Sequence, residues 1–213
     1  MKSNGKIFIL LILLISLTTT LDAQKKKDNP ETYYGLNFGM IASKINFNPA
    51  VDQTFLTGYN GGLIFRHISK KNLGVQVELN YSQRGWSESD GLYTRQLNYI
   101  ELPFMTHFNF GNNFRSFFNV GPKISYLLSE KTLVNLTQNS TDEQHKTAVE
   151  NPFDYGFCAG LGLLMNIKGQ VVQVEARANY SISDIFSNAK RDYFDNSNNM
   201  NASVNFTWLF QKK

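Results

Sequence analysis

The chain has 213 residues, of which 42% are hydrophobic, 14% aromatic and 18% charged, and its formal net charge is +4. Soluble domains usually contain about a quarter charged residues, so this charged fraction is low. The single cysteine, Cys158, cannot form an internal disulfide, which excludes a disulfide-stapled framework. Beyond residue 17 no stretch approaches the roughly 18 apolar residues of a spanning helix, so any membrane crossing must use strands.

The N-terminal residues predict export. Lys2 and Lys6 precede an apolar run over residues 7–17, and a short polar stretch leads to Ala23. This order is typical of a secretory signal peptide, which we expect over residues 1–23. A helix of that apolar run would reach only about 16 Å, too short for a bilayer core of about 30 Å. Residues 24–32 should then form a flexible basic tail, solvated rather than bound to nucleic acid.

Alternation of apolar and polar residues predicts an all-β fold for residues 33–213. The pattern is clearest over residues 75–82, 172–183 and 202–210, where every second side chain is apolar. A helix cannot produce this pattern, because its faces repeat every 3.6 residues. Weaker alternation completes a set of eight expected strands, at residues 33–44, 57–68, 73–85, 92–108, 114–129, 153–167, 170–184 and 199–211.

The links between these strands differ in length in a regular way. Three short links contain turn residues, at 69–72, 109–113 and 168–169, whereas 45–56, 130–152 and 185–198 are long. In an up-and-down meander all three short links fall at the same end as both termini. Short periplasmic turns and long external loops are typical of outer-membrane barrels. The sequence therefore predicts an eight-stranded antiparallel transmembrane β-barrel with periplasmic termini and an external loop over residues 130–151.

Alternation alone does not say which face of the barrel is outside. A soluble lipocalin-like barrel has an apolar interior, and a membrane barrel reverses this arrangement. The polar face is mostly Asn, Gln, Ser and Gly, which favours the membrane barrel over a soluble exterior rich in Lys and Glu. The apolar face also carries aromatic residues in two bands, as interfacial girdles require. One band holds Phe108, Phe110, Phe114, Trp208 and Phe210, and the other holds Tyr81, Tyr126, Tyr155 and Tyr180.

The polar face includes five charged residues that we expect near mid-height of the barrel. They are Glu78, Glu101, Lys123, Glu175 and Arg177. An eight-stranded barrel is only wide enough for its own side chains, and buried charges must pair. We therefore expect one mixed-sign network that plugs the lumen. A structural role is the main interpretation, and proton or ligand handling is the alternative.

Several segments resemble the recurring strand motifs of PorT-like outer-membrane barrels of Bacteroidetes. They are Leu-Asn-Phe-Gly at 36–39, Glu-Leu-Asn-Tyr-Ser-Gln-Arg-Gly at 78–85, Leu-Asn-Tyr-Ile-Glu-Leu-Pro at 97–103, Asn-Val-Gly-Pro at 119–122 and Glu-Ala-Arg-Ala-Asn-Tyr at 175–180. The resemblance covers nearly the whole chain beyond the expected signal peptide. It implies an outer-membrane barrel domain without implying one function, although the family's namesake acts in protein secretion.

The sequence contains no recognisable catalytic, metal-binding or cofactor-binding motif. His67, His107 and His145 lack metal-ligand spacing, and the first two are expected to be hydrogen-bonded structural residues. We therefore expect a non-enzymatic barrel that contacts outer-membrane lipid and serves in envelope structure, adhesion or a secretion assembly with other envelope proteins. The alternatives are a secreted lipocalin-like barrel binding a small apolar ligand, and an outer-membrane lipid-modifying enzyme with a Ser, His and acid at one rim.

Overall fold

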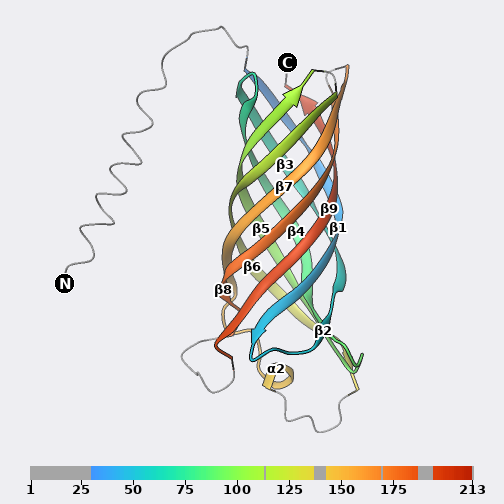
Figure 1. Ribbon diagram of the computed structural model, residues 1–213, viewed down its shortest axis with the longest axis vertical. Coiled ribbons are helices and arrows are strands. Elements are labelled where there is room, and N and C mark those ends of the chain that lie inside the picture. Colours follow the sequence, from blue (N-terminus) through green and yellow to red (C-terminus); the bar gives the residue numbers. More distant parts are fainter. Residues whose placement is uncertain (1–29, 113, 137–142, 169, 187–193, 213) are drawn as a thin grey trace, which may run out of the picture.

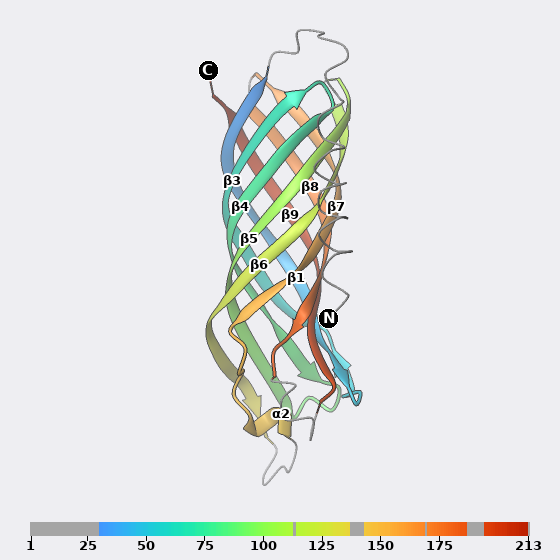
Figure 2. The same ribbon diagram turned by 90° about the vertical axis from the view of Figure 1, so that its left-hand side faces the viewer.

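The computed structural model describes residues 30–112, 114–136, 143–168, 170–186 and 194–212. These residues form a tall antiparallel barrel whose strands wind steeply around a common axis (Figures 1 and 2). Its long strands are β1 (Glu31–Asn48), β3 (Leu56–Lys70), β4 (Leu73–Glu88), β5 (Tyr93–Gly111), β6 (Phe114–Asn135), β7 (Phe153–Ile167), β8 (Gln170–Asp184) and β9 (Asn196–Gln211). The short strand β2 (Gln53–Thr54) pairs with β4, and α2 (Glu143–Lys146) is a single helical turn.

The hydrogen-bonded ladder closes on itself. Each long strand pairs with its neighbour in the chain, and β9 returns to pair with β1, placing Asn205 opposite Gly39 and Ala202 opposite Ala42. A closed ladder leaves neither β1 nor β9 with a free edge along this register. The predicted eight-stranded antiparallel up-and-down barrel is thus confirmed, with β2 as a small ninth strand.

The two ends of the barrel differ as the link lengths predict. The three short connections lie at one end, together with the start of β1 and the end of β9 (Figure 1). The opposite end carries β2, α2 and the longer connections. We call these the turn end and the loop end.

Several strands run further than the alternation predicts. The bounds of β7 and β8 match the expected ones, but β1, β4, β6 and β9 continue several residues further toward the loop end. The expected loop over 130–152 is therefore strand as far as Asn135, and α2 lies within it. At the other end β1 already begins at Glu31, inside the expected tail, whereas the expected signal peptide lies outside the described residues.

The barrel is apolar outside and polar inside over most of its height. In β1, Phe38 is 65% exposed whereas its neighbour Asn37 is only 4% exposed. The same contrast recurs around the barrel, where Leu63, Leu161 and Val204 are exposed while Gln76, Asn119 and Asn205 are buried. A soluble lipocalin-like barrel would show the reverse. This distribution is that of a wall in contact with lipid.

Candidate functional site

The centre of the lumen holds an arginine clamped between two glutamates. Arg177 of β8 donates from Nη1 and Nη2 to the two carboxylate oxygens of Glu78 on β4, at 2.8 and 2.7 Å. Its Nη2 also lies 2.7 Å from Oε2 of Glu175, two residues away on the same strand face. All three side chains are buried. This bidentate contact ties opposite walls of the barrel together.

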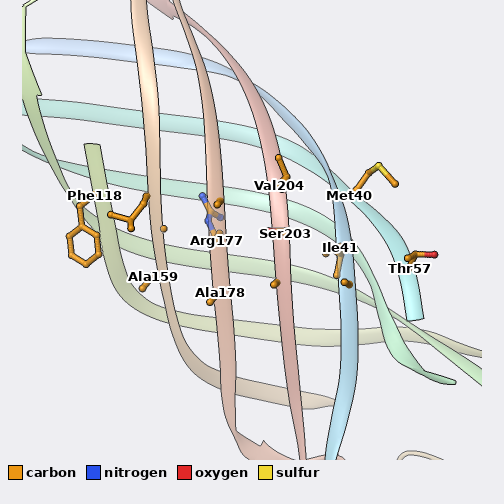
Figure 3. A pocket seen from close by; sticks show the side chains of 14 residues that line it. Met40, Ile41, Thr57, Phe118, Ala159, Arg177, Ala178, Ser203 and Val204 are labelled. Atoms are coloured by element: carbon orange, nitrogen blue, oxygen red, sulfur yellow. The ribbon is translucent and has the colours of Figure 1, made fainter. Parts of the chain in front are cut away.

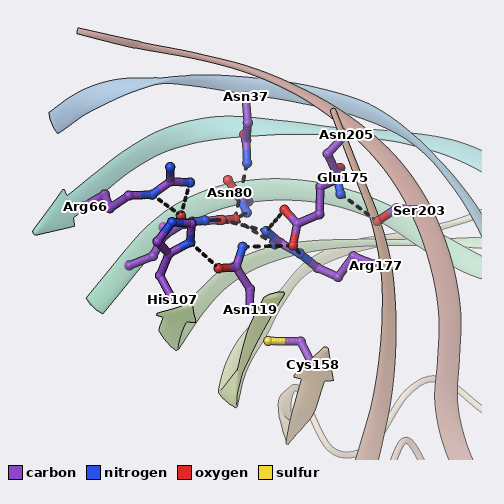
Figure 4. Close-up of polar contacts among 12 residues, drawn as sticks. Asn37, Arg66, Asn80, His107, Asn119, Cys158, Glu175, Arg177, Ser203 and Asn205 are labelled. Carbon is purple, nitrogen blue, oxygen red and sulfur yellow. Dashed lines mark hydrogen bonds and ion pairs between the residues drawn. The ribbon is translucent and has the colours of Figure 1, made fainter. Parts of the chain in front are cut away.

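Polar side chains from other strands complete this group, which we call the Arg177 cluster (Figure 4). Glu78 also accepts hydrogen bonds from Asn37 at 3.2 Å and Asn80 at 2.8 Å. Arg66 of β3 donates to Gln76 at 2.7 Å and to Gln173 at 2.6 Å. Asn119 donates to Glu175 at 3.0 Å and bonds His107 at 2.7 Å. Every carboxylate of the cluster is thus satisfied from several strands, as buried charge requires.

A second group, the Arg84 cluster, lies closer to the loop end. Arg84 of β4 lies 2.8 Å from Glu101 and 2.9 Å from Asp154, and its guanidinium is 4.0 Å from the centre of the Tyr99 ring. Lys123 approaches Glu101 at 3.8 Å. Asp154 further accepts hydrogen bonds from two serines of β8, Ser181 at 3.0 Å and Ser183 at 2.8 Å.

The expected charged residues therefore all face the lumen, but they divide into two clusters instead of one network. Arg177 pairs with Glu78 and Glu175, while Glu101 and Lys123 belong to the Arg84 cluster. Arg177 extends across the barrel toward Glu78 on β4, whereas Glu101 on β5 is paired with Arg84 and Lys123.

Three charged lumen residues were not expected from the sequence: Arg66, Arg84 and Asp154. Each lies an even number of positions from, or directly opposite, a residue that faces the lumen, so it faces the lumen as well. Arg84 lies six positions after Glu78 on β4, and Arg66 is the register partner of the inward-facing Gln76. All three lie within the expected strands 57–68, 73–85 and 153–167, so applying the alternation along those strands would have identified them. With them, the two clusters contain as many basic as acidic side chains: Arg66, Arg84, Lys123 and Arg177 with Glu78, Glu101, Asp154 and Glu175.

Above the Arg84 cluster the polarity of the barrel inverts. On β1 the outward residues change from the exposed, apolar Met40 to the exposed, polar Asn46, while the inward residues Ile45 and Phe47 are apolar and buried. The apolar interior beyond this level is a cluster of buried residues: Ile45, Phe47, Trp86, Tyr93, Leu97, Tyr99, Ile185 and Phe186. We call this part of the barrel the head. A core of buried apolar residues is the arrangement of a water-exposed domain, so we infer that the membrane surface lies near this level. Four apolar side chains of the head remain exposed: Phe55, Leu92, Leu133 and Leu136.

The helical turn α2 closes the head from the loop end. Arg95 forms an ion pair with Glu130 at 3.1 Å and donates to the backbone carbonyls of Gln144 and Thr147 at 3.2 and 2.8 Å. His145 of α2 stacks on Tyr93 with ring centres 3.9 Å apart, and its Nε2 lies 2.7 Å from Glu88. Residues 143–147 are thus fastened over the apolar core of the head.

The outer wall carries the two aromatic bands that the sequence predicts. Phe110, Phe114, Trp208 and Phe210 are exposed near the turn end, and Tyr81, Tyr126, Tyr155 and Tyr180 are exposed nearer the loop end. Phe108, also expected in the turn-end band, is only partly exposed. Between the bands a row of small residues crosses five strands in register: Thr57, Ala42, Ala202, Ala178 and Ala159. This row lines a shallow hollow of about 660 Å³ (Figure 3). The hollow lies on the lipid-facing wall, so it contacts the acyl chains of lipids.

The described residues give little indication of catalytic or metal chemistry. His67 bonds Thr32 at 2.9 Å, and His107 bonds Asn119, so both histidines hold strands together as expected. Within the described part of the chain no group of three or more His, Cys, Asp or Glu side chains is placed to hold a metal ion. Among the same residues, no helix is long and apolar enough to cross a membrane.

Comparison with solved structures finds several small membrane barrels. The attachment invasion locus protein Ail of Yersinia pestis is 13% identical, with a TM-score of 0.44, 84% of this chain and 99% of that chain being covered. Neisserial surface protein A is 8% identical, with a TM-score of 0.48 and coverage of 84% and 98%. OprG from Pseudomonas aeruginosa is 7% identical, with a TM-score of 0.46 and coverage of 86% and 94%. A comparison with curated proteins finds no match.

A family model decides the assignment. The model of the outer membrane protein beta-barrel domain matches residues 23–187, which is most of the chain. The match agrees with the closed ladder, the lipid-facing wall and the polar lumen described above. The chain belongs to the outer membrane protein beta-barrel domain family and is an outer-membrane protein.

Proposed function

We propose that this protein is a closed, non-conducting and non-enzymatic membrane anchor that holds its head at the outer surface of the cell. The observation that carries the proposal is the filled interior. Two charge-balanced clusters occupy the lumen within the membrane, and the apolar core of the head, covered by residues 143–147, fills it above. A pore needs a continuous aqueous path, and neither the ion pairs nor the apolar core provides one.

The proposal assigns the head a role in envelope structure, adhesion or a secretion assembly. Envelope or secretion proteins would then be its partners, in agreement with the resemblance to PorT-like barrels. The histidines support a non-enzymatic role, since they bond Thr32, Asn119 and Glu88 in structural contacts. Crosslinking from exposed head positions such as Lys131, followed by identification of the captured envelope proteins, distinguishes among these roles.

The direct test of closure is electrical. Purified protein inserted into a planar bilayer should give no steady single-channel current. The same preparation must migrate as a folded barrel on an unboiled detergent gel, so that the absence of current cannot be attributed to missing or unfolded protein. Large, steady currents would overturn the closed-lumen proposal and indicate a transport pore.

The proposed orientation places the signal peptide over residues 1–23, the termini in the periplasm and the head outside. Cysteines introduced at Lys131 and at Asn112 test it in a Cys158→Ser background, since both positions are exposed and lie at opposite ends of the barrel. The cysteine at 131 should react with an impermeant thiol reagent on intact cells, and the cysteine at 112 should react only after permeabilisation. The opposite pattern would invert the topology. Sequencing of the mature N-terminus tests cleavage after Ala23.

A further inference from the structure

The turn end is surrounded by basic side chains. Lys70 ends β3 and Lys71 lies in the turn that follows it. Arg115 is the second residue of β6, Lys168 follows β7, and Lys212 follows β9. All are exposed except Arg115, which is half-buried. Every junction around this rim, including the one where β9 meets β1, therefore carries at least one positive charge. We call these five residues the basic ring.

Few of the described carboxylates lie near the basic ring at the turn end. Among the described residues, Glu31 is the only carboxylate within four positions of these strand ends. At the loop end carboxylates outnumber basic groups. The described acidic side chains there are those of Asp52, Glu88, Asp90, Glu130, Glu150, Asp184 and Asp195, and the basic ones are those of Lys44, Arg95, Lys131 and Lys146. Over the described residues the two ends therefore carry opposite net charges, and positive charge collects at the turn end.

The basic ring borders the lipid-facing wall directly. Arg115 follows Phe114, and Lys212 lies two residues beyond Phe210, both aromatic residues of the turn-end band. Interfacial aromatic residues sit where acyl chains give way to headgroups, so basic side chains just beyond them reach the level of the headgroup phosphates.

We propose that the basic ring binds the phosphates of anionic phospholipids in the membrane leaflet at the turn end. Lipid fits this surface better than a protein partner because the charges surround the whole rim and, at three of its four junctions, adjoin exposed apolar side chains: Phe114, Ile167 and Phe210. A protein docking onto one side would leave the remaining junctions unused. A basic side chain near an anionic membrane surface strengthens lipid association about fivefold.

The test measures lipid selectivity in reconstituted bilayers. The wild-type protein is placed in bilayers that contain spin-labelled phosphatidylglycerol or spin-labelled phosphatidylcholine, and the lipid immobilised at the barrel surface is quantified by electron paramagnetic resonance. The wild type should prefer phosphatidylglycerol, and salt should weaken the preference because it screens exposed charges. The variant Lys70→Gln/Lys71→Gln/Lys168→Gln/Lys212→Gln should lose most of the preference.

Two matched variants separate this effect from general changes in charge. Replacing the same four lysines with arginine should retain the preference, and Lys44→Gln/Lys131→Gln/Lys146→Gln at the loop end should leave it nearly unchanged. Added inorganic phosphate should not compete at the ionic strength of a chloride control. If the wild type shows no preference, or if the Gln variant at the turn end keeps it, the proposal is wrong. Loss of a crosslinked periplasmic protein without any change in lipid selectivity would assign the ring to a protein partner instead.

Discussion

Arg177 reaches across the lumen from β8 to hold both carboxylate oxygens of Glu78 on β4, and these strands are not neighbours in the barrel. The contact therefore constrains the cross-section of the barrel in a way that no backbone ladder does. It also supplies the positive charge that allows Glu78 and Glu175 to be buried together.

Arg177→Met should destabilise the barrel by about 3–5 kcal/mol, because it leaves two buried carboxylates uncompensated. Adding Glu78→Gln should restore part of the loss, since one of these charges is then removed. Adding Glu101→Gln should restore none, because Glu101 is held by Arg84 and Lys123. Urea unfolding in detergent micelles measures all three. Equal rescue by both second substitutions would mean that the two clusters act as one network.

Gly160 should not tolerate a side chain. A Cβ at this position would overlap the carboxylate of Glu175, which Arg177 holds in place. Gly160→Ala should therefore cost about 1–3 kcal/mol of unfolding free energy, the usual cost of overpacking. Gly61→Ala is the comparison variant and should cost less, because the nearest atom to its Cβ would be the carbonyl oxygen of Asn37 at 3.1 Å, a tight contact but not an overlap. Similar losses in both variants would contradict this account of the Arg177 cluster.

Removing Arg95 should loosen the segment that covers the head. Arg95→Gln breaks the ion pair with Glu130 and two bonds to the backbone of residues 144 and 147. Hydrogen bonds to a charged group contribute about 1.5–3 kcal/mol, so local opening should become at least about tenfold more frequent. Trypsin should then cut faster after the exposed Lys146. Lys131→Gln, which changes an exposed neighbouring charge, should leave the cleavage rate unchanged.

The two tryptophans should report opposite environments. Trp208 is 46% exposed on the lipid-facing wall, whereas Trp86 is fully buried in the head. In bilayers of brominated lipid, Trp86→Phe should leave strongly quenched fluorescence from Trp208. Trp208→Phe should leave weakly quenched fluorescence from Trp86, because bromine quenches over short distances. Strong quenching of Trp86 would place the head inside the membrane and invalidate the polarity inversion as its boundary.

The folded barrel should resist detergent when unheated. Its backbone groups are paired around a closed ring, so denaturant has no strand edge from which to start. Boiled and unboiled samples should therefore migrate differently on a detergent gel, and carbonate should not extract the protein from membranes. Release by carbonate or high salt would be incompatible with a membrane-spanning barrel.

The strand bounds could be predicted where the same alternation, with apolar residues outward and polar residues inward, holds along the whole strand. The outward positions are apolar along the whole of β7 and from Val172 to Ile182 in β8, and both sets of bounds were predicted correctly. In β1 the apolar residues move from the outward face, where Met40 lies, to the inward positions Ile45 and Phe47, just beyond the expected end of the strand at residue 44. A single rule interprets this inversion as loss of strand, which is why the loop-end extensions of β1, β4, β6 and β9 were missed.

The charged lumen was predictable in composition but not in pairing. The alternation of inward and outward positions, and the distance of each residue from the turn end, identified five charged residues that share the inner face: Glu78, Glu101, Lys123, Glu175 and Arg177. Which of them meet depends on how far each strand is staggered around the ring and how far each side chain reaches across it. Arg84 and Asp154 were missed because they lie close to the level where the alternation inverts.

The pairing of β1 with β9 means that the barrel can complete its fold only when the last strand is available. One edge of β1 stays bare until the last strand, ending at Gln211, arrives to cover it. A partial chain in water would expose that edge together with the apolar outer wall, and both promote aggregation. Closure therefore cannot proceed strand by strand as the chain emerges. The whole polypeptide must be delivered to the membrane in an unfolded, protected form before the ring is sealed.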